Sequence, residues 1–414
     1  MKILKILAAL WALIITLTFF SCAEESTRRQ SKEDDEEETT VEETTTETTE
    51  AVALFEGEPD ETFTEGDFSV AIYDGKAVIV AYIGEDNSVT IPNTLGGYTT
   101  AAIGNGAFSY CNNITDIEIP DSVISIADGA FSFCHSLAKI ELPDGISTIG
   151  EAVFYACHNL AEIKLPDSVT HIKKSAFYDC GSLTEIEISE SVVSIGDKAF
   201  SNCDKLTKIK LPENLSFMGN EVFSYCTNLA EIEIPNGVAS IGERMFYECN
   251  GLLQIKLPDS VNSIGSSAFS GCYNLEKIEI PKGTTFIGEG AFYGCSSLAA
   301  IKIPVGVTDI GASAFGSCRS LTEIEIPSSV TSIGDMAFYY CGSLANIEIS
   351  DGVTSIGKKA FGDCDSLYEI EIPDSVTAIG EDLFIYCLMN PAIICNADSY
   401  AAEYAKNNGI TVKY

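Results

Sequence analysis

Basic residues are scarce in this chain of 414 residues, which has 24 Lys and Arg against 61 Asp and Glu and a net charge of −37. A protein that binds nucleic acid needs a basic track to displace phosphate counterions, so this charge argues against a nucleic-acid partner. Tryptophan occurs once and histidine three times. The chain also lacks H-E-x-x-H, G-x-S-x-G and phosphate-binding glycine motifs. We therefore expect no enzyme, no cofactor and no metal site.

Long apolar runs are also rare, and the clearest one, residues 6–20, lies at the N-terminus after Lys2 and Lys5. This pattern predicts a signal peptide over residues 1–22. Because a small residue precedes Cys22, the segment resembles a bacterial lipoprotein box, which implies export and a lipid on Cys22. Simple secretion is an alternative. A retained membrane anchor is another, although about 15 apolar residues are few for a membrane span.

Residues 23–67 are rich in Glu and Thr, and residues 23–66 carry 17 acidic but only 3 basic side chains. Like charges with few apolar residues cannot form a core, so we predict a disordered linker. It would either lift the rest of the chain off the membrane or be an inert solvated tail.

A 23-residue repeat is what the sequence has in abundance. Phenylalanine recurs at this spacing thirteen times from Phe108 to Phe384, and cysteine follows three residues later each time, from Cys111 to Cys387. A fixed short period predicts a solenoid, which we place at residues 103–395. Stacked repeats would align Ile, Phe and Cys in continuous columns.

One copy of the repeat, residues 137–157, shows how each part is expected to fold. Ile140-Glu141-Leu142 alternates between apolar and charged residues and predicts a half-buried strand that Pro143 ends. Gly150 follows isoleucine, as expected where φ is positive or two backbones approach closely.

The repeat resembles the leucine-rich repeats of the BspA-like surface-protein family over residues 68–409, through its Ile-Pro, Ile-Gly, Ala-Phe and Cys rows. The resemblance implies an α/β-type repeat solenoid with a parallel β-sheet on its concave face. It also implies adhesion to host proteins or other cells. Unlike common leucine-rich repeats, this repeat has no asparagine row, so asparagine-ladder arguments do not apply.

Both ends of the repeat array differ from its interior. Residues 68–102 contain two apolar runs around Asp74-Gly75, which predict a hairpin cap, followed by a degenerate first repeat. Cys395 falls on an inward strand position. Residues 396–414 are predicted to form a C-terminal cap, with a helix from Ser399 to Asn408 that Gly409 ends.

The cysteine row favours free buried thiols, because its members share one apolar register and their number is odd. Disulfides between neighbouring rungs and metal binding are alternatives, since adjacent rungs would come within the disulfide window. We interpret His135, His158 and His171 as ordinary surface residues, because a metal site needs three or four ligands.

Charged side chains recur on the predicted strands. From residue 141 to residue 325 the outward row largely alternates Glu with Lys, which predicts ion pairs between neighbouring strands. A second row lies two residues before this one and contains Glu323 and Glu369. Strict alternation places the second row inward, whereas leucine-rich-repeat folds usually expose it. If this second row is exposed, the C-terminal third of the face gathers five glutamates with no Lys or Arg beside them. We interpret them as a candidate site for a basic binding partner or calcium, and plain solvation is the alternative. They are Glu323, Glu325, Glu348, Glu369 and Glu371.

Tyrosine often follows the repeated phenylalanine. Half-exposed tyrosine suits interfaces and sugar stacking, but it also packs well in an outer wall. These residues are Tyr155, Tyr178, Tyr247, Tyr293 and Tyr339. We predict a monomeric binding protein, an adhesin with a protein or cell-surface partner. A surface spacer that binds nothing and a polysaccharide-binding module are the alternatives.

Overall fold

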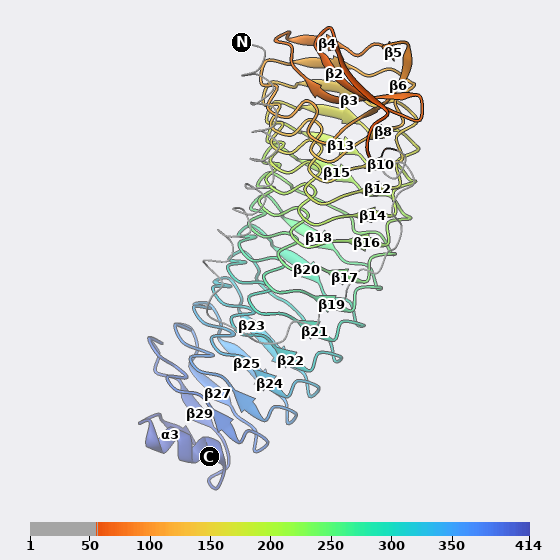
Figure 1. Ribbon diagram of the computed structural model, residues 1–414. Coiled ribbons are helices and arrows are strands. Elements are labelled where there is room, and N and C mark those ends of the chain that lie inside the picture. Colours follow the sequence, from red (N-terminus) through yellow and green to blue (C-terminus); the bar gives the residue numbers. More distant parts are fainter. Residues whose placement is uncertain (1–54, 56) are drawn as a thin grey trace. The chain divides into compact units, whose positions relative to one another are not determined.

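The computed structural model describes residue 55 and residues 57–414, whose repeats stack coil on coil (Figure 1). Each coil uses one 23-residue repeat, so the predicted solenoid is confirmed. The predicted signal peptide, Cys22 and most of the predicted linker lie outside the described residues.

One ladder of short parallel strands follows the predicted Ile-x-Ile positions, with one strand or isolated bridge from each coil. Its central isoleucines point inward and its charged residues outward. Isolated bridges continue it at Glu231, Glu233 and Ala300. The strands are β4 (Ser88–Thr90), β7 (Asp116–Glu118), β9 (Lys139–Glu141), β11 (Glu162–Lys164), β13 (Glu185–Glu187), β15 (Lys208–Lys210), β18 (Gln254–Lys256), β20 (Lys277–Glu279), β23 (Glu323–Ile326), β25 (Asn346–Ile349), β27 (Glu369–Glu371) and β29 (Ala392–Ile394).

A second parallel ladder was not predicted from the sequence. In each coil it contains the isoleucine or methionine directly before the glycine-row position. Its strands are two residues long, too short for alternation to reveal them. They are β8 (Ser125–Ile126), β10 (Thr148–Ile149), β12 (His171–Ile172), β14 (Ser194–Ile195), β16 (Phe217–Met218), β17 (Ser240–Ile241), β19 (Ser263–Ile264), β21 (Phe286–Ile287), β22 (Asp309–Ile310), β24 (Ser332–Ile333), β26 (Ser355–Ile356) and β28 (Ala378–Ile379).

The predicted N-terminal hairpin is confirmed: β2 (Phe68–Tyr73) and β3 (Lys76–Tyr82) pair antiparallel, and Asp74 and Gly75 both have positive φ. β3 extends the second ladder through β6 (Tyr98–Ile103), which also pairs with β5 (Thr94–Leu95). The disordered linker was predicted too long, because β1 (Glu61–Glu65) pairs antiparallel with β2. Thr and Glu alternate there around Phe63, which packs against the core.

At the C-terminus, helix α3 (Tyr400–Asn407) confirms the predicted helix, and the side chain of Ser399 caps it by accepting from Ala402 N. Its buried residues are Ala401, Ala402 and Ala405, whereas Tyr400 is exposed. Beyond the helix, β30 (Val412–Lys413) pairs with β29. Cys395 is buried, as its register predicted.

The glycine row serves close approach rather than positive φ. A Cβ on Gly219 would lie 2.6 Å from the backbone nitrogen of Asp197 on the preceding coil, and one on Gly196 would lie 2.7 Å from that of Lys174. Positive φ instead occurs two residues before and two residues after the phenylalanine, often at residues other than glycine, such as Lys198 and Asn202.

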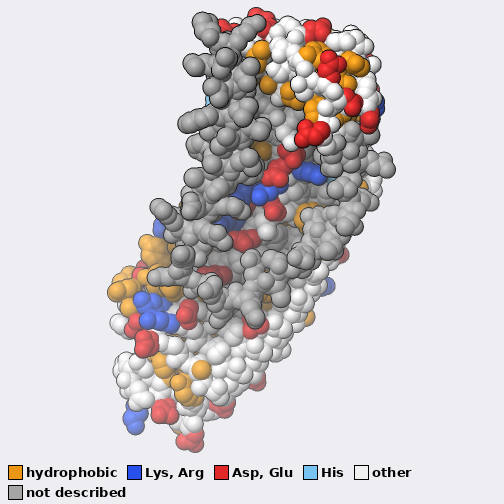
Figure 2. Space-filling view, in the orientation of Figure 1, with side chains coloured by type: hydrophobic (Ala, Val, Ile, Leu, Met, Phe, Trp, Pro, Cys, Tyr) orange, Lys and Arg blue, Asp and Glu red, His pale blue; other side chains and the backbone are white. Residues whose placement is uncertain are grey.

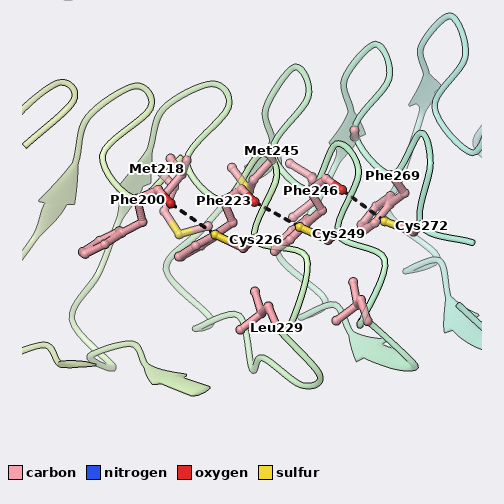
Figure 3. Packing of buried hydrophobic residues seen from close by; sticks show 14 of the residues in the cluster. Phe200, Met218, Phe223, Cys226, Leu229, Met245, Phe246, Cys249, Phe269 and Cys272 are labelled. Carbon is pink, nitrogen blue, oxygen red and sulfur yellow. Dashed lines mark hydrogen bonds between the residues drawn. The ribbon is translucent and has the colours of Figure 1, made fainter. Parts of the chain in front are cut away.

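The phenylalanine column forms the centre of the core. Twelve phenylalanines, from Phe108 to Phe361, are fully buried, and neighbouring rings stack with centroids 5.2–5.9 Å apart. Figure 3 shows four of these rings in one row, with the cysteines beside them. Such offset stacks add about 0.5–1.5 kcal/mol each beyond the burial of area.

The cysteine column makes hydrogen bonds between coils. Each thiol from Cys134 to Cys387 donates to the carbonyl of the phenylalanine one coil earlier; Cys249 Sγ, for example, lies 3.0 Å from Phe223 O (Figure 3). The fourteen described cysteines are free. Burial raises the pKa of Cys111 and Cys387 to about 11 and that of Cys318 to about 12. These thiols therefore stay protonated and serve packing.

Candidate functional site

The strand face presents two outward rows of side chains, one on each side of the buried isoleucine. In β11, for example, Glu162 and Lys164 are exposed while Ile163 is buried. The inward placement by strict alternation was wrong, because residues two apart in a strand point to the same side. All five predicted glutamates therefore face this surface. Figure 2 shows acidic and basic side chains interspersed in the middle part of this face.

In the middle part of this face, the ion pairs run along the strands rather than between them. The predicted register is confirmed, since Glu187 lies opposite Lys210 and Lys256 opposite Glu279. The close contacts on the face itself are nevertheless within one strand: Lys139 Nζ lies 2.7 Å from Glu141 Oε1, and Lys277 Nζ lies 3.0 Å from Glu279 Oε1. Lysines beside glutamates at both positions neutralise this middle part.

The C-terminal part of the face is acidic, as predicted. β23 and β25 pair in parallel register, which sets Glu325 directly beside Glu348. Glu371 is exposed one coil further along. Among residues 57–414, no Lys or Arg forms an ion pair with Glu323, Glu325, Glu348 or Glu371. Two carboxylates opposite each other on neighbouring strands repel, so this arrangement costs stability.

One part of that prediction was wrong, because Glu369 has a basic partner. Lys413 Nζ lies 2.6 Å from Glu369 Oε2, although 44 residues separate them. The pairing of β30 with β29 carries Lys413 to this face. The acidic patch is therefore Glu323, Glu325, Glu348 and Glu371, with Glu369 at its neutralised edge.

An exposed aromatic residue borders the acidic patch and was missed from the sequence. Tyr368, directly before β27, is 60% exposed, and Lys413 Nζ lies 4.8 Å from the centre of its ring. Most other repeats carry Ala or Thr at this position. Tyr368 is an aromatic residue in a row that otherwise carries none, which is the signal that could have revealed it.

The five predicted tyrosines do not form one continuous row. Tyr155 and Tyr178 are half-buried and stack on each other with ring centroids 4.7 Å apart, which fits the alternative that these tyrosines pack in the outer wall. Tyr339 is also half-buried, and its hydrogen bond with Asp363 raises its pKa to about 12. Tyr247 is half-buried and contacts Tyr225 edge to face, whereas Tyr293 is 46% exposed.

Tyr247 and Tyr293 both line a surface hollow of about 430 Å³. Serines from two coils line it as well, three from the coil of Phe269 and one from the coil of Phe315, together with Glu243, Arg244 and Glu289. The strands of the acidic patch contribute no residue to it. We call this hollow the serine trough; its serines are Ser266, Ser267, Ser270 and Ser313.

The histidines lie in two different rows of the repeat: His135 and His158 directly follow the repeated cysteine, whereas His171 does not. The rings of His135 and His158 stack 4.4 Å apart, and His158 Nε2 lies 2.9 Å from Asp179 Oδ2. His171 is in β12, within 2.8 Å of the Thr170 hydroxyl. Within residues 57–414, no group of three His, Cys, Asp or Glu side chains is arranged to hold a metal ion. Nor does this part of the chain contain a helix long and apolar enough to cross a membrane.

Known proteins with the same repeat place the fold in context. The family model described as "BspA type Leucine rich repeat region (6 copies)" matches four overlapping segments that together span residues 101–408. No curated protein matches the chain significantly.

Three crystal structures share the fold. A leucine-rich repeat protein from Bacteroides ovatus is 29% identical over 77% of this chain and 99% of its own, with a TM-score of 0.57. A leucine-rich cell surface protein from Faecalibacterium prausnitzii is also 29% identical, over 81% of this chain and 88% of its own, with a TM-score of 0.52. The pneumococcal vaccine antigen PcpA, 18% identical over 86% of this chain and 99% of its own, has a TM-score of 0.52 and shows the fold alone. The chain belongs to the BspA-type leucine-rich repeat family.

Proposed function

We propose that this chain is an exported surface protein, an adhesin that binds a protein or another cell through the acidic patch. Family membership supports a repeat protein for protein interaction rather than an enzyme. The similar Faecalibacterium prausnitzii protein, described as a cell surface protein, supports a surface location. Repeat surfaces suit large partners, because many modest contacts add up over a broad face.

The observation that carries the proposal is the pairing of Glu325 with Glu348 on adjacent strands. Glu118 also lies beside Glu141, but there Lys139 Nζ lies 2.7 Å from Glu141 Oε1. Among residues 57–414, neither Glu325 nor Glu348 has such a basic partner. A basic partner would relieve the repulsion and gain charge-assisted hydrogen bonds. Calcium is a second ligand that such carboxylates could attract.

Tyr368 gives this patch the aromatic residue that protein interfaces favour. Tyrosine, tryptophan and arginine are enriched among residues that dominate binding energy, because they bury large areas with few rotatable bonds. A ring that is 60% exposed beside an acidic patch has area left to bury.

The N-terminal segments complete the proposal. Residues 1–22 would direct export, a lipid on Cys22 would hold the protein at the membrane, and the acidic linker would separate the solenoid from it. The protein would act as a monomer.

The test is binding of the labelled protein to an array of extracellular-matrix proteins, polysaccharides and whole bacterial cells, with and without calcium. We expect a saturable protein or cell partner whose binding weakens with added salt, because opposite charges steer the encounter. The triple variant Glu325→Lys, Glu348→Lys and Glu371→Lys should lose it.

A matched control changes three glutamates of the same face outside the patch, Glu162→Lys, Glu185→Lys and Glu231→Lys. It has the same net charge as the test variant and should retain binding. Equal losses of binding in both variants would mean that binding depends on the net charge of the protein and not on the acidic patch. If folded protein binds to nothing on the array, a surface spacer that binds nothing would be favoured.

A further inference from the structure

The serine trough exists because small side chains coincide on successive coils. The row two residues before the phenylalanine carries Ser267, Gly290 and Ser313 in three neighbouring repeats, and all three line the trough. Longer side chains stand at both ends of this run, Arg244 on the coil before it and Met336 on the coil after it. The trough therefore lies between the longer side chains of Arg244 and Met336.

In the row directly after the phenylalanine, two tyrosines lie on either side of a coil that carries a serine instead of an aromatic residue. Tyr247 and Tyr293 occupy the same row two coils apart, and the residue between them is Ser270. Two strand spacings separate the rings' positions by roughly 10 Å, which leaves room for one flat ring between them. Tyr155 and Tyr178, on adjacent coils, instead stack on each other and leave no such space.

The polar groups of the trough are available to a ligand. Among the described residues, the hydroxyls of Ser266, Ser267 and Ser313 form no side-chain hydrogen bond, so they can donate and accept. Glu243 and Glu289 supply carboxylates, which bind pairs of hydroxyl groups strongly. Arg244 adds a donor, with Nη1 3.8 Å from Glu243 Oε1.

This combination matches one ligand class. A pyranose ring has apolar C–H faces that pack on aromatic rings and equatorial hydroxyls that need several hydrogen-bond partners. Two carboxylates against one guanidinium disfavour an anionic ligand, and the guanidinium disfavours an amine. We propose that the serine trough binds a pyranose unit of a neutral oligosaccharide, with its ring between Tyr247 and Tyr293. This site is independent of the acidic patch.

The experiment is a titration of the full chain against an array of hexasaccharides of glucose, mannose, galactose, xylose and N-acetylglucosamine. We expect saturable binding of at least one of them. Tyr247→Ala and Tyr293→Ala should each weaken it about tenfold, because each removes one stacking face. Tyr178→Ala, in the same row but outside the trough, should leave the affinity unchanged.

A second variant fills the trough without disturbing the fold. Lys198 and Lys359 occupy the same row as Ser267 with the same left-handed backbone, φ 58 and 55 against 53, so this position tolerates lysine. Ser267→Lys should abolish binding, while Ala152→Lys, in the same row outside the trough, should retain it.

Three results would overturn the proposal: no hexasaccharide binds folded protein, Ser267→Lys binds as well as the parent chain, or choline chloride competes with the sugar. The triple glutamate variant of the acidic patch should bind the sugar normally. A joint loss of protein and sugar binding in that variant would refute the independence of the two sites.

Discussion

The phenylalanine column makes a quantitative prediction about how the solenoid loses stability. Phe246 is fully buried, and the rings of Phe223 and Phe269 stack on it with centroids 5.7 and 5.3 Å away. Phe246→Ala removes both stacks and leaves a cavity that flanking coils cannot fill, so we expect a loss of about 3–5 kcal/mol. Phe246→Leu keeps most of the volume but loses two stacks, which predicts about 1–3 kcal/mol.

The matched control is Phe384→Ala at the C-terminal end of the column. Phe384 is only partly buried, and no aromatic ring stacks on it among the described residues. Its replacement should therefore cost clearly less than that of Phe246.

Urea denaturation followed by circular dichroism measures these losses, and hydrogen exchange locates them. Because each coil contacts only its neighbours, the largest loss of amide protection in Phe246→Ala should fall in the adjacent coils. If Phe384→Ala costs as much as Phe246→Ala, or if protection falls evenly from end to end, the column does not stabilise the fold as a chain of local stacks.

Four further predictions concern the backbone, the thiols and pH. Gly219→Ala should lower the urea midpoint, because its Cβ would lie 2.6 Å from Asp197 N, whereas Gly181→Ala, with no atom within 4 Å of its Cβ, should be neutral or slightly stabilising. Met336→Gly should raise the free energy of unfolding by up to ~1 kcal/mol, because φ at Met336 is 53° and glycine adopts this conformation without strain; an unchanged or lower urea midpoint would contradict this. Within the cysteine column of the native protein at pH 9, a thiol reagent should modify Cys111 and Cys387 first, because they lie at the two ends and burial raises the pKa of the interior thiols further still. Uniform labelling of the column would argue that it is open. Hydrogen bonds from Ser332, Thr308 and Thr331 hold the pKa of Asp309 below its usual value. The Asp309 carboxylate therefore stabilises the fold above pH ~4, and this contribution is lost as the pH falls through the lowered folded-state pKa. Asp309→Asn should destabilise the protein at pH 7 but make little difference at pH 2.

Much of the fold follows from the sequence because its constraints are repeated thirteen times. A buried phenylalanine in one copy could have several explanations, but a column of them at fixed spacing requires stacking. The hairpin at Asp74-Gly75 and the helix after Ser399 were predictable for a different reason, since both depend on local signals.

The parts that could not be predicted depend on contacts between coils. The second ladder uses two residues per coil, which carry no alternation. Left-handed backbone occurs at Lys198 and Met336, residue types that rarely adopt it, because hydrogen bonds to the next coil hold both backbones there: Lys198 N donates to Asn220 O, and Met336 N donates to Lys358 O. The thiol hydrogen bonds are equally invisible in a sequence that shows only a small apolar row.

The candidate sites divide in the same way. The acidic patch was predictable because its residues recur at the 23-residue period in the two outward rows, yet the neutralisation of Glu369 was not, since Lys413 reaches it through β30 after the repeats have ended. Tyr247 and Tyr293 were identified as aromatic residues, but the trough between them depends on small residues in a different row.

The repeat thereby separates stability from recognition. Phenylalanine, cysteine and isoleucine are nearly constant in every coil, and they lie inside. Positions that vary from coil to coil, such as those of Tyr368 and Ser267, lie on the outside, where substitution costs little packing. Binding specificity in such a molecule must reside where the repeat is broken, because a surface identical on every coil would offer a partner many equivalent registers. The acidic patch, with Tyr368 beside it, and the serine trough are two places where this chain breaks its own pattern.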